Sequence, residues 1–406
     1  MNVYLRELSS AITRFPEVTM DIFTRTQNSR IRGIRKISPR VRVIHLKGGP
    51  ESPVSRKNLY GFLPEFLRNF EEFIIGNQIT YDLVYSHYWL SGLIGEWIRQ
   101  KYHLPLIHTF HTLAFLKKRA EKDRYEEQVN RLRVERHLTH ISDAVISSSE
   151  HEKKSLCREY KISPLKIRII YPGVNEQRFY PQDSKEARNE LGFREEDKII
   201  LYVGRIEPVK SLSTLIETLY IMKRKVPFLY NKLKLVIVGG GSVSSEHLKN
   251  REITVIKDLI EVSRMQDKVL FIGSKKQNQL KNYYSAADVL VMPSLYESFG
   301  LVVIEALACG TPVVGSRINE MITIIEEGKN GFYFNPGDPD SLFFSLNHFF
   351  SQRNTLWDRK KVRKNIISRF SWNKTAEETY TFFKEMVKSS VYEDNLTQPD
   401  ERPQSA

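Results

Sequence analysis

The sequence predicts an α/β fold with two domains, each built on a doubly wound parallel sheet. Short apolar strands alternate with helical stretches, which is typical of strand–helix–strand units around a parallel sheet. The alternation pauses near Pro172 and restarts at residue 198. A length of 406 residues is also enough for two or three domains. We therefore predict a first domain over 1–172 and a second over 173–370.

Each domain contributes a series of predicted strands and helices. The strands of the first are expected at 18–24, 41–46, 83–87, 106–110, 144–149 and 167–170, with helices at 1–12, 59–75, 90–102 and 125–140. The strands of the second are expected at 198–203, 234–238, 269–273, 287–292, 312–315 and 331–334, with helices at 301–309 and 338–350 and from about 359. A further helix is predicted over 371–390. Residues 391–406 are polar and contain proline, so we expect a disordered tail there.

The beginning of the sequence is unusual for this fold class. Residues 1–12 have the pattern of an amphipathic helix, whereas an α/β domain rarely opens on a helix without a strand before it. We expect that one strand and the loop after it are missing. Such a strand would be central in a parallel sheet, so its absence should expose two strand edges.

The chain is basic, with 62 Lys and Arg against 48 Asp and Glu and a formal charge of +14. Residues 22–50 hold eight Lys or Arg and no acidic residue. No aromatic interleaving or nucleic-acid module accompanies them, so we expect no nucleic-acid partner. Attraction for anionic substrates, or weak peripheral association with an anionic membrane surface, explains the charge better.

Three absences favour a cytoplasmic location. No run of eighteen apolar residues and no signal-peptide layout is present. The two cysteines, Cys157 and Cys309, have no metal-ligand spacing and form no disulfide framework. Both fall in helical patterns, so buried thiols in a reducing compartment are expected.

The most informative stretch runs from Glu297 to Val314. A buried strand, a turn at Gly300 and a helix follow one another, and that arrangement places bare amides and a helix dipole where an anion binds. Glu305 lies two helical turns beyond Glu297, on nearly the same side. Carboxylates in such a place suit sugar hydroxyls. The alternative is a pair of solvated helix carboxylates.

Arg205 and Lys210 follow the first predicted strand of the second domain, directly after Gly204. A planar guanidinium and a point charge beside a glycine suit a diphosphate, although the pair could also be a surface charge cluster. No Asp-x-Asp motif directly follows a predicted strand. We therefore expect cationic side chains, rather than a metal ion, to neutralise the diphosphate.

The stretch around Glu297 and Glu305 resembles a known motif. Two glutamates are separated by seven residues; Phe-Gly-Leu follows the first and Ala-x-x-x-Gly-x-Pro-Val-Val the second. This is similar to the nucleotide-sugar motif of retaining glycosyltransferases of family 4, which have the two-domain GT-B fold. The resemblance covers nearly the whole chain and is greatest to the inositol-phosphate glycosyltransferase and sucrose-phosphate synthase group.

The resemblance implies a role for each matching residue on the donor side. Glu305 would bind the ribose and Glu297 the donor sugar hydroxyls, while Arg205 and Lys210 would neutralise the diphosphate. The backbone amides near sugar and phosphate would be those of Phe299, Gly300 and Leu301. His111, after the strand at 106–110, matches the histidine that reaches the donor sugar near the reacting carbon, although a lone histidine there is often only a satisfied polar residue. His111 and Glu297 are thus the catalytic candidates.

The resemblance also implies an acceptor site for a phosphate group. The matching positions are Asn2, Lys57 (or Arg56, since the register is uncertain), Tyr88, Thr112 and Arg131. Each has a simpler alternative, such as a solvated helix charge for Arg131 or a core position for Tyr88. Together these side chains suit a dianionic phosphate.

Two features depart from the family pattern. The family places a strand and a Gly-Gly loop before the first helix, which supports the missing strand predicted above. It also usually has Gly-Gly where this chain has residues 318–321, Ile-Asn-Glu-Met. Bulky side chains there could change the donor pocket.

These inferences together predict an enzyme. The resemblance implies a retaining transferase that moves a hexosyl group from a nucleotide-diphosphate sugar, a UDP-sugar, to a phosphorylated polyol or sugar, such as an inositol phosphate or fructose phosphate. Attack would occur on the front face, with the donor phosphate accepting the acceptor proton and without a cofactor or metal. A sugar-nucleotide epimerase of the same fold and a truncated, non-catalytic nucleotide-sugar binder are the alternatives.

Overall fold

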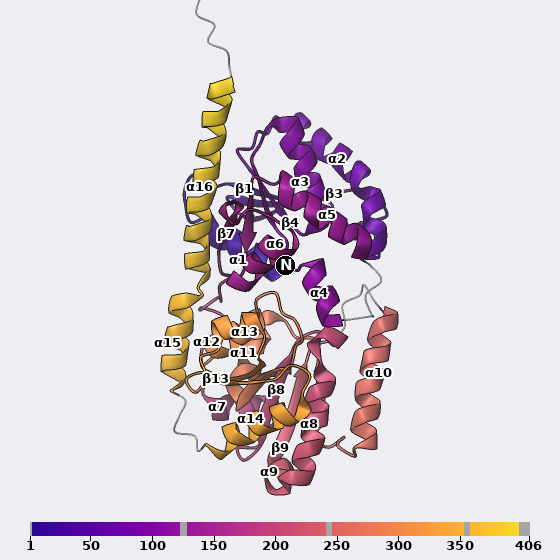
Figure 1. Cartoon of the computed structure of the whole chain (residues 1–406), viewed down its shortest axis with the longest axis vertical. Helices are drawn as coiled ribbons and strands as arrows, with labels where there is room; N and C mark the ends of the chain where they lie inside the picture. Colours follow the sequence, from indigo (N-terminus) through magenta and orange to yellow (C-terminus); the bar gives the residue numbers. More distant parts are fainter. Residues whose placement is uncertain (1, 122–127, 241–245, 353–357, 398–406) are drawn as a thin grey trace, which may run out of the picture. The chain divides into compact units, whose positions relative to one another are not determined.

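The structure is a computed structural model that describes residues 2–121, 128–240, 246–352 and 358–397. The chain divides into two compact units (Figure 1). Unit 1 comprises 1–114, 127–170 and the chain from 373 onward, and unit 2 comprises 115–126 and 171–372. The boundaries lie two residues from those expected at 172 and 370. Residues 115–126, which we expected in the first domain, group with unit 2.

Unit 1 contains two sheets. One has the order β1-β3-β2, with β1 (Met20–Arg25) parallel to β3 (Val41–Leu46) and β2 (Gly33–Ser38) antiparallel to it. The other is parallel, in the order β4 (Val84–His87), β5 (Leu106–Thr109), β6 (Ala144–Ser147) and β7 (Ile167–Ile169). The helices of unit 1 include α1 (Asn2–Ile12), α2 (Leu63–Gly76), α3 (Trp89–Tyr102), α5 (Gln128–Ile141) and α6 (Glu150–Glu159).

Strands β1 and β4 are both edge strands in the part of the chain that the structure describes. Phe23 of β1 and Val84 of β4 nevertheless pack against one apolar cluster, which includes Ile44, Phe70 and Ile98. The two sheets therefore share a core with α2 and α3. Two strand edges were expected from the sequence; the strand that would lie between them stays a prediction.

The basic stretch forms the strand that the sequence did not predict. Strand β2 is almost wholly exposed, and its arginine, lysine and isoleucine side chains do not show the alternation of a half-buried strand. Ile34 and Ile37 are each 47% exposed. This segment is therefore extended because it pairs with β3 and not because one of its faces is buried. A prediction based on hydrophobic alternation consequently does not detect it.

The C-terminal helix belongs to unit 1. Helix α16 (Trp372–Thr397) packs against the turn after α1, where Tyr380 stacks on Phe15 with ring centroids 4.0 Å apart. Phe382 enters the core beside Ile107 and Ile146. The disordered tail expected from 391 is wrong for 391–397, which continue the helix, because a helix anchored by packing can extend through polar sequence. Residues 398–406 lie outside the described residues.

Unit 2 is built on one six-stranded parallel sheet. Its order is β10 (Val269–Gly273), β9 (Leu233–Val238), β8 (Lys198–Val203), β11 (Val289–Met292), β12 (Val313–Ser316) and β13 (Gly331–Phe334). The helices of this part of the chain are α4 (Ala114–Glu121), α7 (Ser184–Leu191), α8 (Leu212–Lys225), α9 (Pro227–Lys232), α10 (Glu246–Val262), α11 (Gln277–Ala286), α12 (Leu301–Ala308), α13 (Asn319–Ile324), α14 (Pro339–Ser351) and α15 (Arg359–Arg369). Since all strands are parallel, the loops after them meet along one edge.

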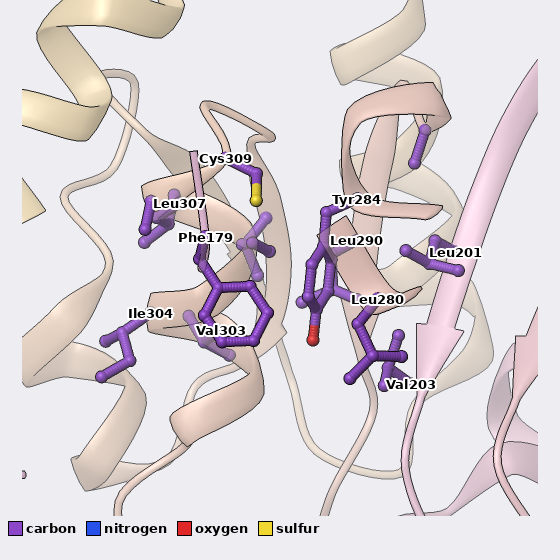
Figure 2. Close-up of a cluster of buried hydrophobic side chains, with 14 of the residues drawn as sticks. Phe179, Leu201, Val203, Leu280, Tyr284, Leu290, Val303, Ile304, Leu307 and Cys309 are labelled. Carbon is purple, nitrogen blue, oxygen red and sulfur yellow. The ribbon is translucent and has the colours of Figure 1, made fainter. Parts of the chain in front are cut away.

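Two apolar clusters form the core of unit 2. One joins α11, α12 and α15 to β8 and β11, and Figure 2 shows Phe179, Tyr284, Val303 and Cys309 within it. The other joins α8, α10 and α14 to the same sheet (Figure 1). The inner strands are therefore buried on both faces, which explains their continuous runs of Val, Ile and Leu, whereas the edge strand β10 is partly exposed. Among the described residues, no helix is both long and apolar enough to span a bilayer.

One close backbone contact fixes the ends of two strands in unit 2. Gly239 has a φ of +150°, and a Cβ built there would lie 1.8 Å from the carbonyl oxygen of Gly204. The Gly204 amide donates to the carbonyl of Val238 at 3.0 Å. The loop that carries Arg205 is thus held directly against the loop after β9.

Replacement of Gly239 by alanine should therefore destabilise the protein through a backbone clash. We expect Gly239→Ala to lower the free energy of unfolding by about 1–3 kcal/mol. Gly328→Ala is the control, because Gly328 also has a positive φ (+76°) but has open space at the Cβ position. Denaturant titration of both variants measures the difference. An equal loss in the two would show that conformational strain alone, and not the contact with Gly204, makes Gly239 necessary.

The exposed β2 region should bind anionic lipid surfaces weakly. Arg30, Arg35 and Lys36 are exposed beside the isoleucines, and each cation near an anionic surface contributes about 1 kcal/mol. We expect sedimentation with phosphatidylglycerol vesicles at low salt, none with phosphatidylcholine vesicles, and loss of binding in an Arg35→Glu, Lys36→Glu double variant. Unchanged binding by the double variant would place the lipid contact elsewhere.

Candidate functional site

Each unit presents a group of predicted site residues at the carboxyl ends of its strands. In unit 2, the turn before α12 depends on Gly300, which caps the helix with a φ of +100°. A Cβ at Gly300 would lie 2.5 Å from the Cε of Met321. A side chain is therefore excluded both by the backbone conformation and by the packing of α13. Phe299, just before the turn, is buried in the core, and Leu301 begins the helix.

Glu297 and Lys210 form an ion pair between two strand-end loops. Their side chains are only 13% and 14% exposed. The Ser294 hydroxyl donates to the same Glu297 oxygen at 3.0 Å. The backbone joins the two loops as well, because the Leu295 amide donates to the carbonyl of Val209 at 2.8 Å. The structure thus brings together a carboxylate and a cation that the sequence separates by 87 positions.

Arg205 lies in the same loop as Lys210 but is engaged differently. Its Nη1 donates to Glu207 Oε1 at 2.7 Å, and about half of the side chain is exposed. The Tyr202 hydroxyl donates to the Arg205 carbonyl at 2.7 Å and thereby fixes the backbone of this loop. Burial of that hydroxyl raises the pKa of Tyr202 above its ordinary value, so it stays a donor. The guanidinium can therefore reach an anion at the surface of unit 2.

Glu305 points into unit 2 and is only 6% exposed. The Tyr284 hydroxyl donates to its Oε2 at 2.9 Å, and the Gln277 amide donates to its Oε1 at 3.3 Å. Burial and, to a smaller extent, the Glu305 charge raise the pKa of the neighbouring Cys309 thiol. The alternative of two solvated carboxylates is therefore wrong, because both Glu297 and Glu305 are held by donors inside the unit.

The departure at residues 318–321 places three of its four residues in or against the core. Met321 is fully buried and fills the space next to Gly300 and Gly315. Ile318 packs against the same core. Glu320, in the first turn of α13, is 3% exposed. The apolar bulk thus enters the core, and its effect on the donor pocket stays a prediction.

In unit 1, three residues predicted for the acceptor side come together. Arg131 of α5 donates from Nη2 to the Thr112 hydroxyl at 2.9 Å and to the Thr112 carbonyl at 2.5 Å. Its Cζ lies 4.8 Å from the centroid of the Tyr88 ring. Arg131 is 6% exposed, so the alternative of a solvated helix charge is wrong. A guanidinium, a hydroxyl and a phenol ring from three separate elements therefore form one cluster.

Glu135 holds this cluster from within the core. It is completely buried and accepts from Arg131 Nε at 2.6 Å, from the Ala114 amide at 2.9 Å and from the Tyr160 hydroxyl at 2.5 Å. Burial raises the pKa of the Glu135 carboxyl, and the charge of Arg131 opposes that shift. In the sequence, only its position one helical turn after Arg131 points to Glu135.

Tyr88 and His111 both have strained backbones at the ends of adjacent strands. Tyr88 has φ of 74° and ψ of 154°, a region normally occupied by glycine, and His111 has φ of +59°. Strain of about 1–3 kcal/mol at each position persists only where the surroundings enforce it, and it is concentrated at functional sites. The sequence pattern points to both residues through their side chains and contains no sign of the backbone strain.

His111 is paired with His87, which was not among the residues predicted for the site. His87 Nδ1 lies 2.9 Å from His111 Nε2, and the two rings are nearly parallel, with centroids 5.1 Å apart. Burial lowers the pKa of His87 to about 3 and the pKa of His111 well below its ordinary value. Both rings are therefore neutral at pH 7. The only sequence signal for His87 was its place beside Tyr88 at a strand end.

The remaining acceptor candidates are less defined. Asn2 is exposed in the first turn of α1, which contacts the histidine pair through Tyr4. The side chains of Lys57 and Arg56 lie outside the described residues, so the register question between them stays open. Within the described ranges, no three His, Cys, Asp or Glu side chains gather as metal ligands would. Metal independence stays a prediction.

Two family models match the chain. The model for glycosyl transferases group 1 matches residues 183–369, and the model for glycosyltransferase family 4 matches residues 1–178. A D-inositol 3-phosphate glycosyltransferase from Catenulispora acidiphila is 32% identical over 390 residues, which cover 96% of this chain and 90% of that protein. The chain belongs to glycosyltransferase family 4. The resemblance stated from the Glu297 motif is thereby confirmed.

Solved structures place this glycosyltransferase in the GT-B fold. The sucrose-phosphate synthase of Thermosynechococcus elongatus has a TM-score of 0.86 and 29% identity, covering 96% of this chain and 94% of that one. The Anabaena protein HepE, solved in complex with UDP, has a TM-score of 0.68 and 18% identity and covers 84% and 86% of the two chains. The second likeness shows the fold alone. The predicted fold class and the prediction of a transferase are both confirmed.

Acid should destabilise this glycosyltransferase through its buried histidines. His108 is completely buried, and burial lowers its pKa to about 3. In the unfolded chain a histidine takes up a proton near pH 6.5, whereas folded His108 stays neutral down to about pH 3. Protonation therefore favours the unfolded state, so the contribution of His108 to the free energy of unfolding is complete above pH 6.5 and is lost as the pH falls toward 3. Each pH unit in this window should lower the free energy of unfolding by about 1.4 kcal/mol per buried histidine.

The measurement is denaturant unfolding between pH 7.5 and 5 for the wild type and for His108→Gln. The glutamine variant should lose less stability over this range, by about 1–2 kcal/mol. The matched control is His137→Gln, an exposed position on α5. An equal pH slope for wild type and His108→Gln would contradict the argument.

Proposed function

We propose that this glycosyltransferase moves a hexosyl group from a UDP-sugar to a phosphorylated polyol or sugar, with retention of the anomeric configuration and without a metal ion. The observation that carries the acceptor half is the cluster of Arg131, Thr112 and Tyr88 in unit 1. A buried guanidinium beside a hydroxyl is a strong partner for a phosphate dianion. The named activity of the D-inositol 3-phosphate glycosyltransferase relative supports the same acceptor class.

The donor half of the proposal uses the strand-end loops of unit 2. Glu305, held by Tyr284 and Gln277, binds the ribose hydroxyls. Glu297 meets the hydroxyls of the sugar, and Arg205 and Lys210 balance the charge of the diphosphate. Lys210 already pairs with Glu297, so one cation would link the sugar-binding carboxylate to the leaving group. Arg205 is the more exposed of the two cations and would close onto the diphosphate.

The reaction that we propose agrees with this arrangement of charges. The acceptor hydroxyl oxygen bonds to the anomeric carbon on the face from which the diphosphate leaves, and its proton passes to an oxygen of the departing phosphate. Negative charge grows on the diphosphate as the glycosidic bond breaks, so fixed cations stabilise the transition state more than the ground state. Configuration is retained because attack and departure share one face, and no side chain needs to act as the nucleophile.

The proposal is tested by transfer assays with phosphorylated and unphosphorylated acceptors. UDP-glucose and UDP-N-acetylglucosamine are offered with inositol 3-phosphate or fructose 6-phosphate, and with free inositol or fructose as controls. UDP release and glycoside formation are followed by mass spectrometry. Product with the phosphorylated acceptors alone supports the proposal. Interconversion of the donor sugar without an acceptor favours the epimerase, and UDP binding without any turnover favours the non-catalytic binder.

Variants test the donor residues of unit 2 and the acceptor residues of unit 1 separately. Arg131→Lys keeps the positive charge beside Glu135 but loses the planar guanidinium group that can donate two parallel hydrogen bonds. The variant should therefore raise the acceptor KM about 10- to 100-fold through a lost charge-assisted hydrogen bond. Its affinity for UDP should be unchanged. Glu305→Ala should abolish UDP binding in calorimetry. Retained UDP affinity in Glu305→Ala would defeat the donor assignment, and an unchanged acceptor KM in Arg131→Lys would defeat the acceptor assignment.

A further inference from the structure

His87 is buried beside His111 and has no role in the proposed reaction. His87 is the last residue of β4 and His111 follows the adjacent parallel strand β5, and the hydrogen bond between them joins Nδ1 of His87 to Nε2 of His111 at 2.9 Å. His87 is 8% exposed, whereas His111 is more open. The inner ring therefore supports the outer one.

Aromatic side chains on several sides fix the orientation of both rings. Tyr85 lies against His87 with ring centroids 4.1 Å apart, and Tyr4 meets His111 edge to face at 5.1 Å. Hydroxyl groups join these two tyrosines at 3.2 Å, and Tyr85 continues to the Thr109 hydroxyl at 2.8 Å. Helix α1 and strands β4 and β5 thus hold the pair together.

We propose that His87 is a positioning residue for His111: it occupies Nε2 of the His111 ring, leaves Nδ1 as the only ring nitrogen that can meet a substrate, and holds the ring in a single tautomer. This inference rests on the proposed function together with the role that the family resemblance implies for His111, which is to reach the donor sugar near the reacting carbon. The hydrogen bond between the two side chains carries it.

Where the two neutral imidazoles meet, the two facing nitrogens have one hydrogen between them. One of the two facing nitrogens must carry the proton and the other must be bare, so the state of one ring fixes the tautomer of the other. Burial keeps both rings neutral, because it disfavours the imidazolium form. Without His87, the His111 ring could flip and exchange tautomers, and a part of the molecules would present the wrong nitrogen state to the substrate.

The backbone of His111 supports the same conclusion. Its φ of +59° lies in the left-handed region, which a non-glycine residue adopts only when surrounding contacts enforce it. Tyr88, directly after His87, has a positive φ as well. Both histidines are therefore placed at constrained strand ends. A fixed backbone would not fix the position of the His111 nitrogens if the imidazole ring could still rotate.

The first arm of the test is NMR of the full chain labelled with ¹⁵N-histidine at pH 7, without substrate. The signals of His111 are assigned by their loss in His111→Asn. We expect one His111 nitrogen to have the shift of a protonated nitrogen and the other that of a bare one. In His87→Phe, which keeps a flat ring but no nitrogen, both signals should move toward the averaged shifts of exchanging tautomers. His137→Phe, at an exposed position of unit 1, is the control and should leave them unchanged.

The second arm is kinetic. His87→Phe should lower kcat about 10- to 100-fold, as loss of an outer partner of a functional ring does, with the donor and acceptor KM values changed less than about threefold. His87→Asn, whose amide can stand in for Nδ1, should restore most of kcat and the single-tautomer spectrum. A merely structural role would instead lower the melting temperature in both variants and leave the His111 signals as they are.

The two arms separate failure of this inference from failure of the proposed function. Averaged His111 tautomers in the wild type, or unchanged signals in His87→Phe, overturn the role of His87 whatever the enzyme transfers. If His87→Phe does not fold, the wild-type spectrum and His87→Asn still decide. A fixed tautomer that His87→Phe releases supports the positioning role even if no acceptor is turned over, in which case only the proposed function fails.

Discussion

Buried charged and polar groups must find partners, and this requirement organises both candidate sites. Glu135 is completely enclosed yet accepts hydrogen bonds from a guanidinium, a backbone amide and a phenol. Glu305 is held by Tyr284 and Gln277 in the same manner. An unpaired carboxylate at such positions would cost several kcal/mol, so its partners become fixed with it. The residues that would meet substrate are thereby aligned without any ligand.

A second constraint comes from the backbone at the strand ends. The loops that follow parallel strands all lie at one edge of the sheet, so neighbouring loops are close together there. Gly239 and Gly300 meet this limit by having no side chain, since a Cβ at either position would overlap an adjacent group. Tyr88 and His111 meet it with strained conformations instead. Glycine gives room for backbone approach, whereas the strained residues place a functional side chain at the same kind of position.

The sequence predicted much of the fold because its signals were local. The strands at 41–46, 198–203, 269–273 and 331–334 have the bounds expected from their apolar runs. Strand β2 was missed because its extended form depends on pairing with β3 and not on burial. The continuation of α16 to Thr397 was missed because composition favoured disorder there. In both cases a contact with a distant segment overrides the local pattern.

The candidate site divides in the same way. By itself the sequence determined the family, through Glu297, Gly300 and Glu305 at a fixed spacing on one turn and helix, because such a motif needs no distant partner. Only the tertiary structure decided that Lys210 pairs with Glu297, that Arg131 is buried against Thr112, and that His87 supports His111. These pairs join segments far apart in the chain, and their contacts arise only when parallel strands place their ends side by side.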